Sequence, residues 1–155
     1  MSRFGAVFRS RNNLDMNLQV GVKALIKNSR GEYLFMRRSI VLATDTSEPS
    51  WDIPGGRIES DEYLPAALKR EVQEEIGHEI QSTPQLVAAQ DIFVSAKDLH
   101  VVRLTYTLRE DIDDIALSEE HEEYVWVHES QLETVNAEPY LAEVLMQLRE
   151  PPTLL

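Results

Sequence analysis

Hydrophobic and polar residues alternate along several stretches of the chain, and this period of two is typical of β-strands with one buried face. The first two stretches flank Asn28-Ser29-Arg30-Gly31, which has the composition of a turn, so they predict a hairpin. Two later stretches flank Ala96-Lys97-Asp98 and predict a second pair of strands. With one final stretch, the predicted strands are residues 18–27, 33–37, 85–94, 99–108 and 124–128.

Two segments have the apolar spacing of a helix instead. The first begins near Tyr63 or Leu64, so that Pro65 falls in the first turn, where a missing N–H costs little. Gly77 follows the last periodic residue, as is common at helix C-termini. Residues 140–148 predict a second, amphipathic helix. Strands first, one helix in the middle and one at the end indicate an α/β fold with a mixed sheet between helices.

The length of 155 residues is enough to bury a full core and suits one domain, which we expect to span residues 1–155. Repeats, low-complexity tracts and interdomain linkers are absent from the sequence. Residues 1–17 are expected to form an N-terminal arm. The polar stretch 39–50 is expected to form a loop long enough to contribute to a pocket wall.

Composition indicates an ordinary globular protein, with 43% hydrophobic and 27% charged residues. The sequence has no cysteine, which excludes disulfides and thiolate metal sites and fits a reducing compartment, so we expect a cytoplasmic protein. It also has no apolar run long enough to span a membrane, and residues 1–17 lack the apolar core of a signal peptide. The arginines in this segment (Arg3, Arg9 and Arg11) belong to the expected arm rather than to a transit peptide.

The net charge of −12 is concentrated in two segments. Residues 59–79 hold seven acids and two bases, and residues 110–123 hold eight acids and no lysine or arginine. A protein this acidic is poorly suited to coating duplex nucleic acid, because cationic contacts supply most of the non-specific affinity. We expect the second segment to be mostly solvated, with one or two members recruited to the site. The first segment has a more specific pattern.

Three carboxylates in the predicted central helix lie on one face. Glu71, Glu74 and Glu75 are three and four residues apart, and residues at these spacings are neighbours on a helix surface. Like charges at this distance destabilise a helix by a few tenths of a kcal/mol per pair. A divalent cation held by oxygen ligands would offset that repulsion.

The same region resembles the Nudix box, G-x5-E-x7-R-E-U-x-E-E-x-G-U, where U is a bulky aliphatic residue. The match covers residues 56–78 and departs from the pattern at His78, where the family usually has an aliphatic residue. Residues 51–56 resemble the segment that precedes the box, and residues 120–127 resemble a later acidic loop and strand. The residues that match the box are Gly56, Glu62, Arg70, Glu71, Val72, Glu74, Glu75 and Gly77.

The resemblance implies an α/β/α sandwich and a hydrolase that uses Mg²⁺ or Mn²⁺ to cleave a nucleoside diphosphate linked to another group. It also implies that Arg70 orients a box glutamate and that Glu62 is the structural partner of Arg70. A homodimer is a further expectation from the family alone. The implied metal ligands are Glu71, Glu74, Glu75, the main-chain carbonyl of Gly56, and Glu120 from the later acidic loop.

Two glutamates are candidates for the general base, since Nudix proteins differ in using a box residue or one from a later loop. Glu71 is the box candidate and Glu120 is the loop candidate. His121 is a third possibility, because histidine titrates near neutral pH, although a single loop histidine is more often simply exposed. If the loop register differs, the loop glutamate is instead Glu119, Glu122 or Glu123.

Substrate contacts are expected just before and inside the loop that faces the metals. Arg37, Arg38 and Arg57 are candidates for binding phosphate, and ordinary surface arginine is an equal alternative for each. Trp51 is the candidate for stacking on a base. Core packing is the expected role of the other aromatic residues considered, which are Tyr106, Tyr124 and Trp126.

The substrate class is narrowed by what the sequence lacks. The markers typical of ADP-ribose, dinucleoside polyphosphate and coenzyme A hydrolases do not occur around residues 93–95 or upstream of the box. A MutT-like (d)NTP pyrophosphatase is therefore the leading hypothesis. A sugar-nucleotide hydrolase is the alternative, because of the acidic-His-acidic-acidic-Tyr-x-Trp run at 120–126. A binding module without catalysis is the other class, and such modules tend to lose box glutamates that are all present here.

Overall fold

The computed structural model describes residues 16–39 and 50–150, and these form one seven-stranded sheet with a helix on each side. Of the predicted arm, residues 1–17, the first fifteen lie outside the described residues and Asn17 already belongs to the first strand; most of the predicted loop, residues 40–49, also lies outside them. The strands are β1 (Asn17–Lys27), β2 (Glu32–Arg38), β3 (Trp51–Asp52), β4 (Gly55–Arg57), β5 (Gln85–Val94), β6 (Leu99–Arg109) and β7 (His121–His128). The helices are α1 (Leu64–Ile76) and α2 (Pro139–Arg149), with short 3-10 turns η2 (Ser95–Lys97) and η3 (Glu129–Thr134).

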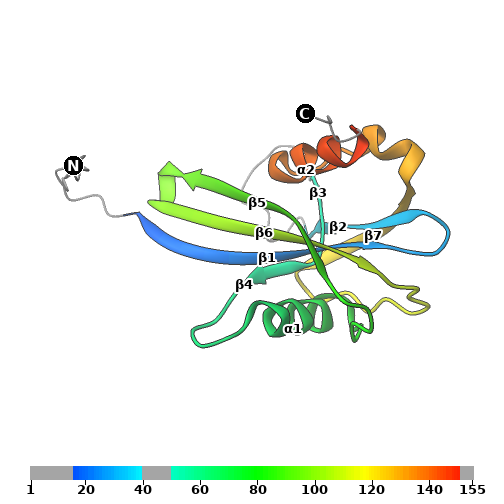
Figure 1. Cartoon of the computed structure of the whole chain (residues 1–155), viewed down its shortest axis with the longest axis horizontal. Coiled ribbons are helices and arrows are strands. Elements are labelled where there is room, and N and C mark those ends of the chain that lie inside the picture. Colours follow the sequence, from blue (N-terminus) through cyan, green and yellow to red (C-terminus); the bar gives the residue numbers. More distant parts are fainter. Residues whose placement is uncertain (1–15, 40–49, 151–155) are drawn as a thin grey trace, which may run out of the picture.

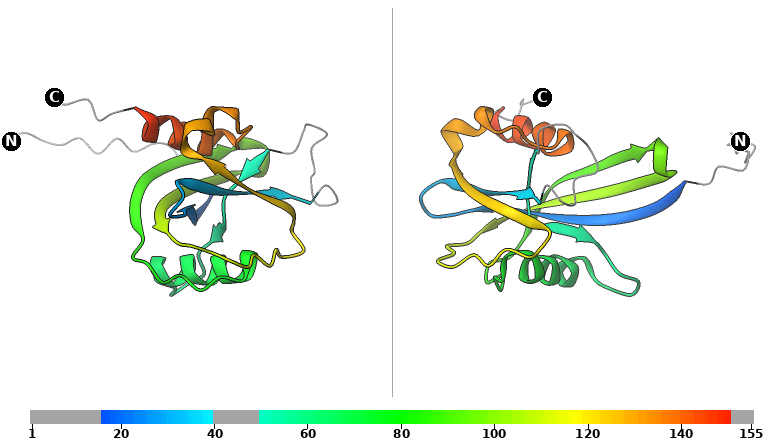
Figure 2. Two further views of the ribbon diagram at one scale, coloured as in Figure 1. Left: turned by 90° about the vertical axis from the view of Figure 1, so that its right-hand side faces the viewer. Right: turned by 180° about the vertical axis from the view of Figure 1, so that it is seen from behind.

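The sheet is mixed, as the sequence predicts. Its main strand order is β3-β2-β1-β6-β5, while β4 pairs with β1 and β7 pairs with β2. The long central pair β1 and β6 is parallel and the other strand pairs are antiparallel. Figures 1 and 2 show α1 and α2 on opposite faces of this sheet, which confirms the α/β/α sandwich.

The core consists of two apolar clusters, one on each face of the sheet. The cluster under α1 includes Ala24 and Ile26 of β1, and the cluster under α2 includes Leu25 from the same strand. Strand β1 is therefore covered on both faces, as central strands of a sandwich are. The strand departs from the simple alternation that predicts it: Leu18 is exposed, and Gly21, Lys23 and Leu25 are buried although they lie on the other face.

The boundaries of α1 agree with the predicted ones. Tyr63 is the N-cap residue, Pro65 lies in the first turn, and Gly77 ends the helix in the left-handed conformation with φ of 68°. The Gly77 N–H donates to the Gln73 carbonyl, which satisfies one of the free carbonyls at the helix end. The apolar face of α1 packs on the sheet, so its acidic face is directed to the turn that contains β4.

Three features differ from the sequence expectation. Strand β7 begins at His121 rather than at residue 124. Strands β3 and β4 are too short to give an alternating pattern and were not predicted as strands. His78, the departure from the box, lies half-buried with Nε2 3.5 Å from a carboxylate oxygen of Glu110. No helix among the described residues is long and apolar enough to cross a membrane.

Candidate active site

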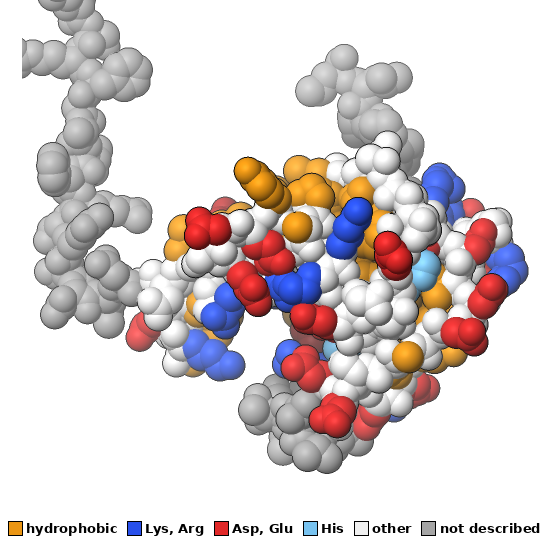
Figure 3. Space-filling view, turned by 90° about the horizontal axis from the view of Figure 1, so that it is seen from below, with side chains coloured by type: hydrophobic (Ala, Val, Ile, Leu, Met, Phe, Trp, Pro, Cys, Tyr) orange, Lys and Arg blue, Asp and Glu red, His pale blue; other side chains and the backbone are white. Residues whose placement is uncertain are grey.

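A cavity of about 630 Å³ lies between the acidic face of α1, the turn at β4 and the loop before β7. On this side of the molecule the surface is hollowed, and acidic and basic side chains both gather around the hollow (Figure 3). The loop is held over the helix because Ser118 donates its N–H to the Glu75 carbonyl. The structure thus brings together Gly56, Glu71, Glu74, Glu75 and Glu120, with Arg38 and Arg57.

Arg70 ties the carboxylates of α1 to the turn at β4. Its Nε and Nη2 donate to the two Glu62 oxygens at 2.7 and 2.9 Å, which is a bidentate pair. Its Nη1 donates to Glu71 at 2.9 Å and to Glu74 at 3.3 Å, and Nη2 also reaches the Arg57 carbonyl. Hydrogen bonds from Arg70 lower the pKa of the Glu62 carboxyl to about 2. The guanidinium therefore fixes the turn and the helix relative to each other.

Glu75 is the buried carboxylate of the site, with only 9% of its surface exposed. Its Oε2 accepts the Gly55 N–H at 2.9 Å. Burial raises its pKa to about 7, against the opposing effects of Lys23 and the Gly55 N–H. Ionising this buried carboxyl costs free energy, unless a further positive charge lies next to it.

Glu71 lies against the glycine turn. Burial raises its pKa, although Arg70 acts in the opposite direction. A Cβ atom added to Gly56 would lie 2.7 Å from the Glu71 carboxylate, so the turn can approach this closely only without a side chain. At Gly55, φ is 146° and an added Cβ would lie 2.0 Å from the Val22 carbonyl oxygen. Both glycines are thus required by the close approach of turn, strand and helix.

The donors around this cavity fit a hard divalent cation. Five glutamates line the cavity, and carboxylate oxygens are ligands that Mg²⁺ and Mn²⁺ prefer. Across residues 16–39 and 50–150, no three acidic or imidazole side chains converge as ligands in this arrangement. Arg70 instead donates hydrogen bonds to Glu71 and Glu74, and the Gly55 N–H donates to Glu75. Arg70 thus places a positive charge beside two of the three α1 carboxylates.

The candidates for the general base on the loop before β7 and at the start of β7 lie in different surroundings. Glu119 and Glu120 line the cavity, whereas Glu122 and Glu123 form ion pairs with Arg37 at 3.5 and 2.5 Å. His121 is buried rather than exposed, and burial together with Lys23 and Arg38 lowers its pKa. Its Nδ1 lies 3.4 Å from the Ser118 hydroxyl oxygen, and it does not line this cavity.

The predicted substrate contacts fall into two groups. Arg38 and Arg57 line the cavity. Arg37 instead lies with its guanidinium 5.4 Å from the centre of the Trp51 ring, in addition to its ion pairs on β7. Neither Arg37 nor Trp51 lines this cavity or the second one described below, and Trp51 packs at the margin of the core under α2.

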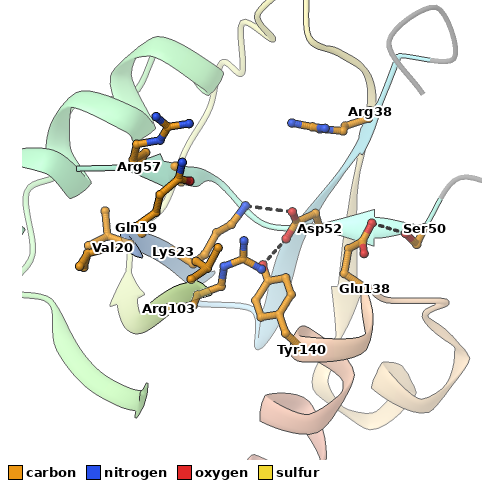
Figure 4. A pocket seen from close by; sticks show the side chains of 15 residues that line it. Gln19, Val20, Lys23, Arg38, Ser50, Asp52, Arg57, Arg103, Glu138 and Tyr140 are labelled. Atoms are coloured by element: carbon orange, nitrogen blue, oxygen red, sulfur yellow. Dashed lines mark hydrogen bonds and ion pairs between the residues drawn. The ribbon is translucent and has the colours of Figure 1, made fainter. Parts of the chain in front are cut away.

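A second cavity, of about 320 Å³, opens beside the first and shares Arg38, Gly55, Gly56 and Arg57 with it. It is lined by β1, β6 and the start of α2 (Figure 4). Lys23 Nζ donates to Asp52 at 2.9 Å and to the Ile53 carbonyl, and the Tyr140 hydroxyl donates to Asp52. Burial opposes ionisation of Asp52, but Lys23 and these hydrogen bonds outweigh it and hold the pKa of Asp52 low.

Arg38, Gly56 and Arg57 were predicted from the sequence, but the charged and aromatic residues at the inner end of this second cavity, Lys23, Asp52, Arg103 and Tyr140, were missed. Lys23 and Arg103 interrupt strands that are otherwise apolar at the centre, and Asp52 directly precedes the Ile53-Pro54-Gly55-Gly56 turn. A charged residue in the middle of a central strand is a signal that sequence reasoning can use, because such groups are buried only when they are paired. The pattern does not show which residues these charged groups contact, because Tyr140, which donates to Asp52, lies far along the chain.

Comparisons with known proteins agree with this fold. The family model described as NUDIX domain matches residues 17–148. A MutT protein from Methanosarcina mazei is 28% identical, with a TM-score of 0.74 over 86% of this chain and 94% of that one. The ORF135 protein of E. coli is 26% identical, with a TM-score of 0.70 over 90% and 96%. A MutT NUDIX hydrolase from Burkholderia pseudomallei, 22% identical, shares the fold with a TM-score of 0.72 over 85% and 98%.

Proposed function

The chain belongs to the Nudix family and is a Nudix hydrolase, and from this premise we propose that it cleaves the pyrophosphate bond of nucleoside triphosphates in a reaction dependent on Mg²⁺ or Mn²⁺. The observation that carries the proposal is the single cavity in which three α1 carboxylates face Arg38 and Arg57. A pyrophosphate needs positive charge on its oxygens and a positioned water, and these two sets of residues can supply both.

The proposed cation ligands are Glu71, Glu74, Glu75, Glu120 and the Gly56 carbonyl. When bound, a divalent cation would neutralise phosphate charge and lower the pKa of a water molecule. Arg70 then acts as a positioning residue, because its bidentate grip on Glu62 keeps the helix and the glycine turn in register. The Gly55 N–H orients the buried carboxylate of Glu75.

Arg38 and Arg57 are the proposed phosphate ligands, because both lie where the two cavities meet. Neither has an ion pair with an acidic side chain elsewhere in the described ranges, so their charge is available. Arg37 is a weaker candidate than its sequence position suggests, because it is engaged by β7 and Trp51.

Glu71 and Glu120 remain the candidates for the base that removes a proton from the attacking water. Both line the cavity, and Glu71 has a pKa raised by burial, which increases its basicity. The structure supports His121 less, because it is buried at the start of β7 and does not line the cavity.

Two observations favour a nucleoside triphosphate over a sugar nucleotide. Similar structures include proteins named MutT. The run at 120–126 suggests a sugar-nucleotide hydrolase, but its tryptophan does not reach the substrate cavity. Trp126 packs against the core under α1, and Glu120 is the residue of this run that lines the cavity. The complete set of box glutamates favours hydrolysis over nucleotide binding without turnover.

The test is release of inorganic pyrophosphate or phosphate from a panel of nucleoside triphosphates and sugar nucleotides with Mg²⁺ or Mn²⁺. We expect turnover of triphosphates, reduced at least about 100-fold by Glu74→Gln or Glu75→Gln. Glu79→Gln is the matched control, because Glu79 is exposed just beyond the same helix. Tight nucleotide binding with no turnover under either metal would contradict the proposal and favour the binding module.

A further inference from the structure

Arg103, at the inner end of the second cavity, has hydrogen-bonding capacity that the described residues do not use. It lines this cavity from the middle of β6, and its Nε is shielded from solvent without a hydrogen-bond partner. Neither an ion pair nor a side-chain hydrogen bond joins this guanidinium to another residue within 16–39 and 50–150. An unpaired, shielded donor costs free energy, and a ligand that brings an acceptor into this cavity would recover it.

The guanidinium is held in place although it is unpaired. It lies 4.1 Å from the centre of the Tyr140 ring, in a cation–π contact. Tyr140 is fixed in turn by its hydroxyl, which donates to Asp52, and by its main-chain carbonyl, which accepts from Gln90. Gly21 is the direct neighbour of Arg103 on β1, so no side chain from that position covers it. The fork is therefore preorganised and faces the open cavity.

The carboxylates near Arg103 are already used, whereas Oε1 of Gln90, its neighbour on β5, is shielded and has no hydrogen-bond partner among the described residues. Asp52 accepts from Lys23, Tyr140 and the Ile53 N–H. Glu138 accepts from Ser50 on the other side of the cavity, away from Arg103 (Figure 4). Gln90 does not line this cavity, so among the lining residues the Arg103 guanidinium has no free acceptor, and Gln19 lies toward Arg57 rather than toward Arg103 (Figure 4).

The position of the cavity indicates which part of a substrate reaches Arg103. Arg38 and Arg57 stand where the two cavities join, so phosphates bound there leave the attached nucleoside to enter the second cavity. Its volume of about 320 Å³ is at the lower end of the range of pockets that hold small molecules. The Tyr140 face under Arg103 is already covered, so discrimination there depends on hydrogen bonds rather than on stacking.

We propose that Arg103 is a specificity-determining residue that selects nucleobases presenting carbonyl oxygens, such as guanine and uracil, over adenine. The inference rests on the proposed function, since it takes the substrate to be a nucleotide. Guanine offers O6 and N7 as adjacent acceptors that match an arginine fork. Adenine places an amino donor at the corresponding position, where it meets another donor. A site built to hydrogen-bond one group rejects the analogue that leaves its polar atoms unpaired.

The experiment measures binding of GMP, UMP and AMP to the full chain by calorimetry in EDTA, where hydrolysis does not interfere. We expect the wild type to bind GMP and UMP about tenfold more tightly than AMP. Arg103→Met is expected to bring the three affinities within about twofold, with AMP little changed. Arg103→Lys keeps the charge without the fork and is expected to lose most of the preference. Arg109→Met, at the exposed end of the same strand, is the matched control.

Several outcomes would overturn the inference. These are equal affinities in the wild type, no measurable binding of any monophosphate, or a preference that survives in Arg103→Met. Equal weakening of all three nucleotides and of ribose 5-phosphate would show that Arg103 binds phosphate instead. A lower melting temperature with unchanged preference would assign it a structural role. Glu74→Gln separates the two proposals, because it is expected to abolish turnover and leave the base preference intact.

Discussion

At the scale of single residues, the site depends on carboxylates whose burial makes ionisation costly. Glu75 is the clearest case, because it is 9% exposed and has a single hydrogen bond from the Gly55 N–H. Because it is buried, the ionised Glu75 carboxylate destabilises the fold when no cation is bound. The same burial makes it a strong ligand when a cation is bound. Stability and function therefore have opposite requirements at this position.

A pH dependence follows for the protein in EDTA. The pKa of Glu75 is raised from 4.5 to about 7 in the folded state, so the folded state binds this proton more tightly than the unfolded state. The contribution of protonated Glu75 to the free energy of unfolding is complete below about pH 4.5 and is lost as the pH rises through about 7. Glu75→Gln is expected to remove a decline on the order of 3 kcal/mol in the free energy of unfolding between these pH values.

The measurement is urea unfolding of both proteins across this pH range with a chelator present. Parallel pH profiles for wild type and Glu75→Gln would contradict the burial argument. Added Mn²⁺ is expected to stabilise the wild type more at high pH than at low pH, since the ligand must be deprotonated.

At the scale of elements, one arginine joins helix α1 to the turn at β4. Arg70 contacts Glu62 before the helix, Glu71 and Glu74 on the helix, and the Arg57 carbonyl in β4. The planar fork supports this set of contacts, which the point charge of a lysine does not reproduce. The arrangement of the carboxylates is thus a property of the helix and the turn together.

Arg70→Lys is expected to reduce kcat at least about tenfold, with a smaller change in KM for the nucleotide. The physical reason is that Glu71 and Glu74 lose their common partner, whereas Arg38 and Arg57 still bind phosphate. Steady-state kinetics measures the loss of kcat, and thermal melting shows whether Arg70→Lys remains folded. Equal kcat values in the two proteins would exclude a positioning role for Arg70.

At the scale of the whole molecule, the sequence predicts local structure better than it predicts assembly. The boundaries of α1 were predictable because Pro65 and Gly77 act through local backbone geometry. The parallel pairing of β1 with β6 was not, because it joins segments separated by about half the chain and depends on packing against both helices. The same limit applies to the second cavity, whose network from Lys23 to Tyr140 exists only in the assembled fold.

Anomalous diffraction from crystals soaked in Mn²⁺ tests the proposed cation site on α1 most directly. We expect an anomalous peak among Glu71, Glu74 and Glu75, beside the glycine turn, and we expect the peak to disappear in Glu74→Gln crystals. A map without a peak there, with Arg70 still donating to Glu71 and Glu74, would contradict the assignment of a cation-dependent active site.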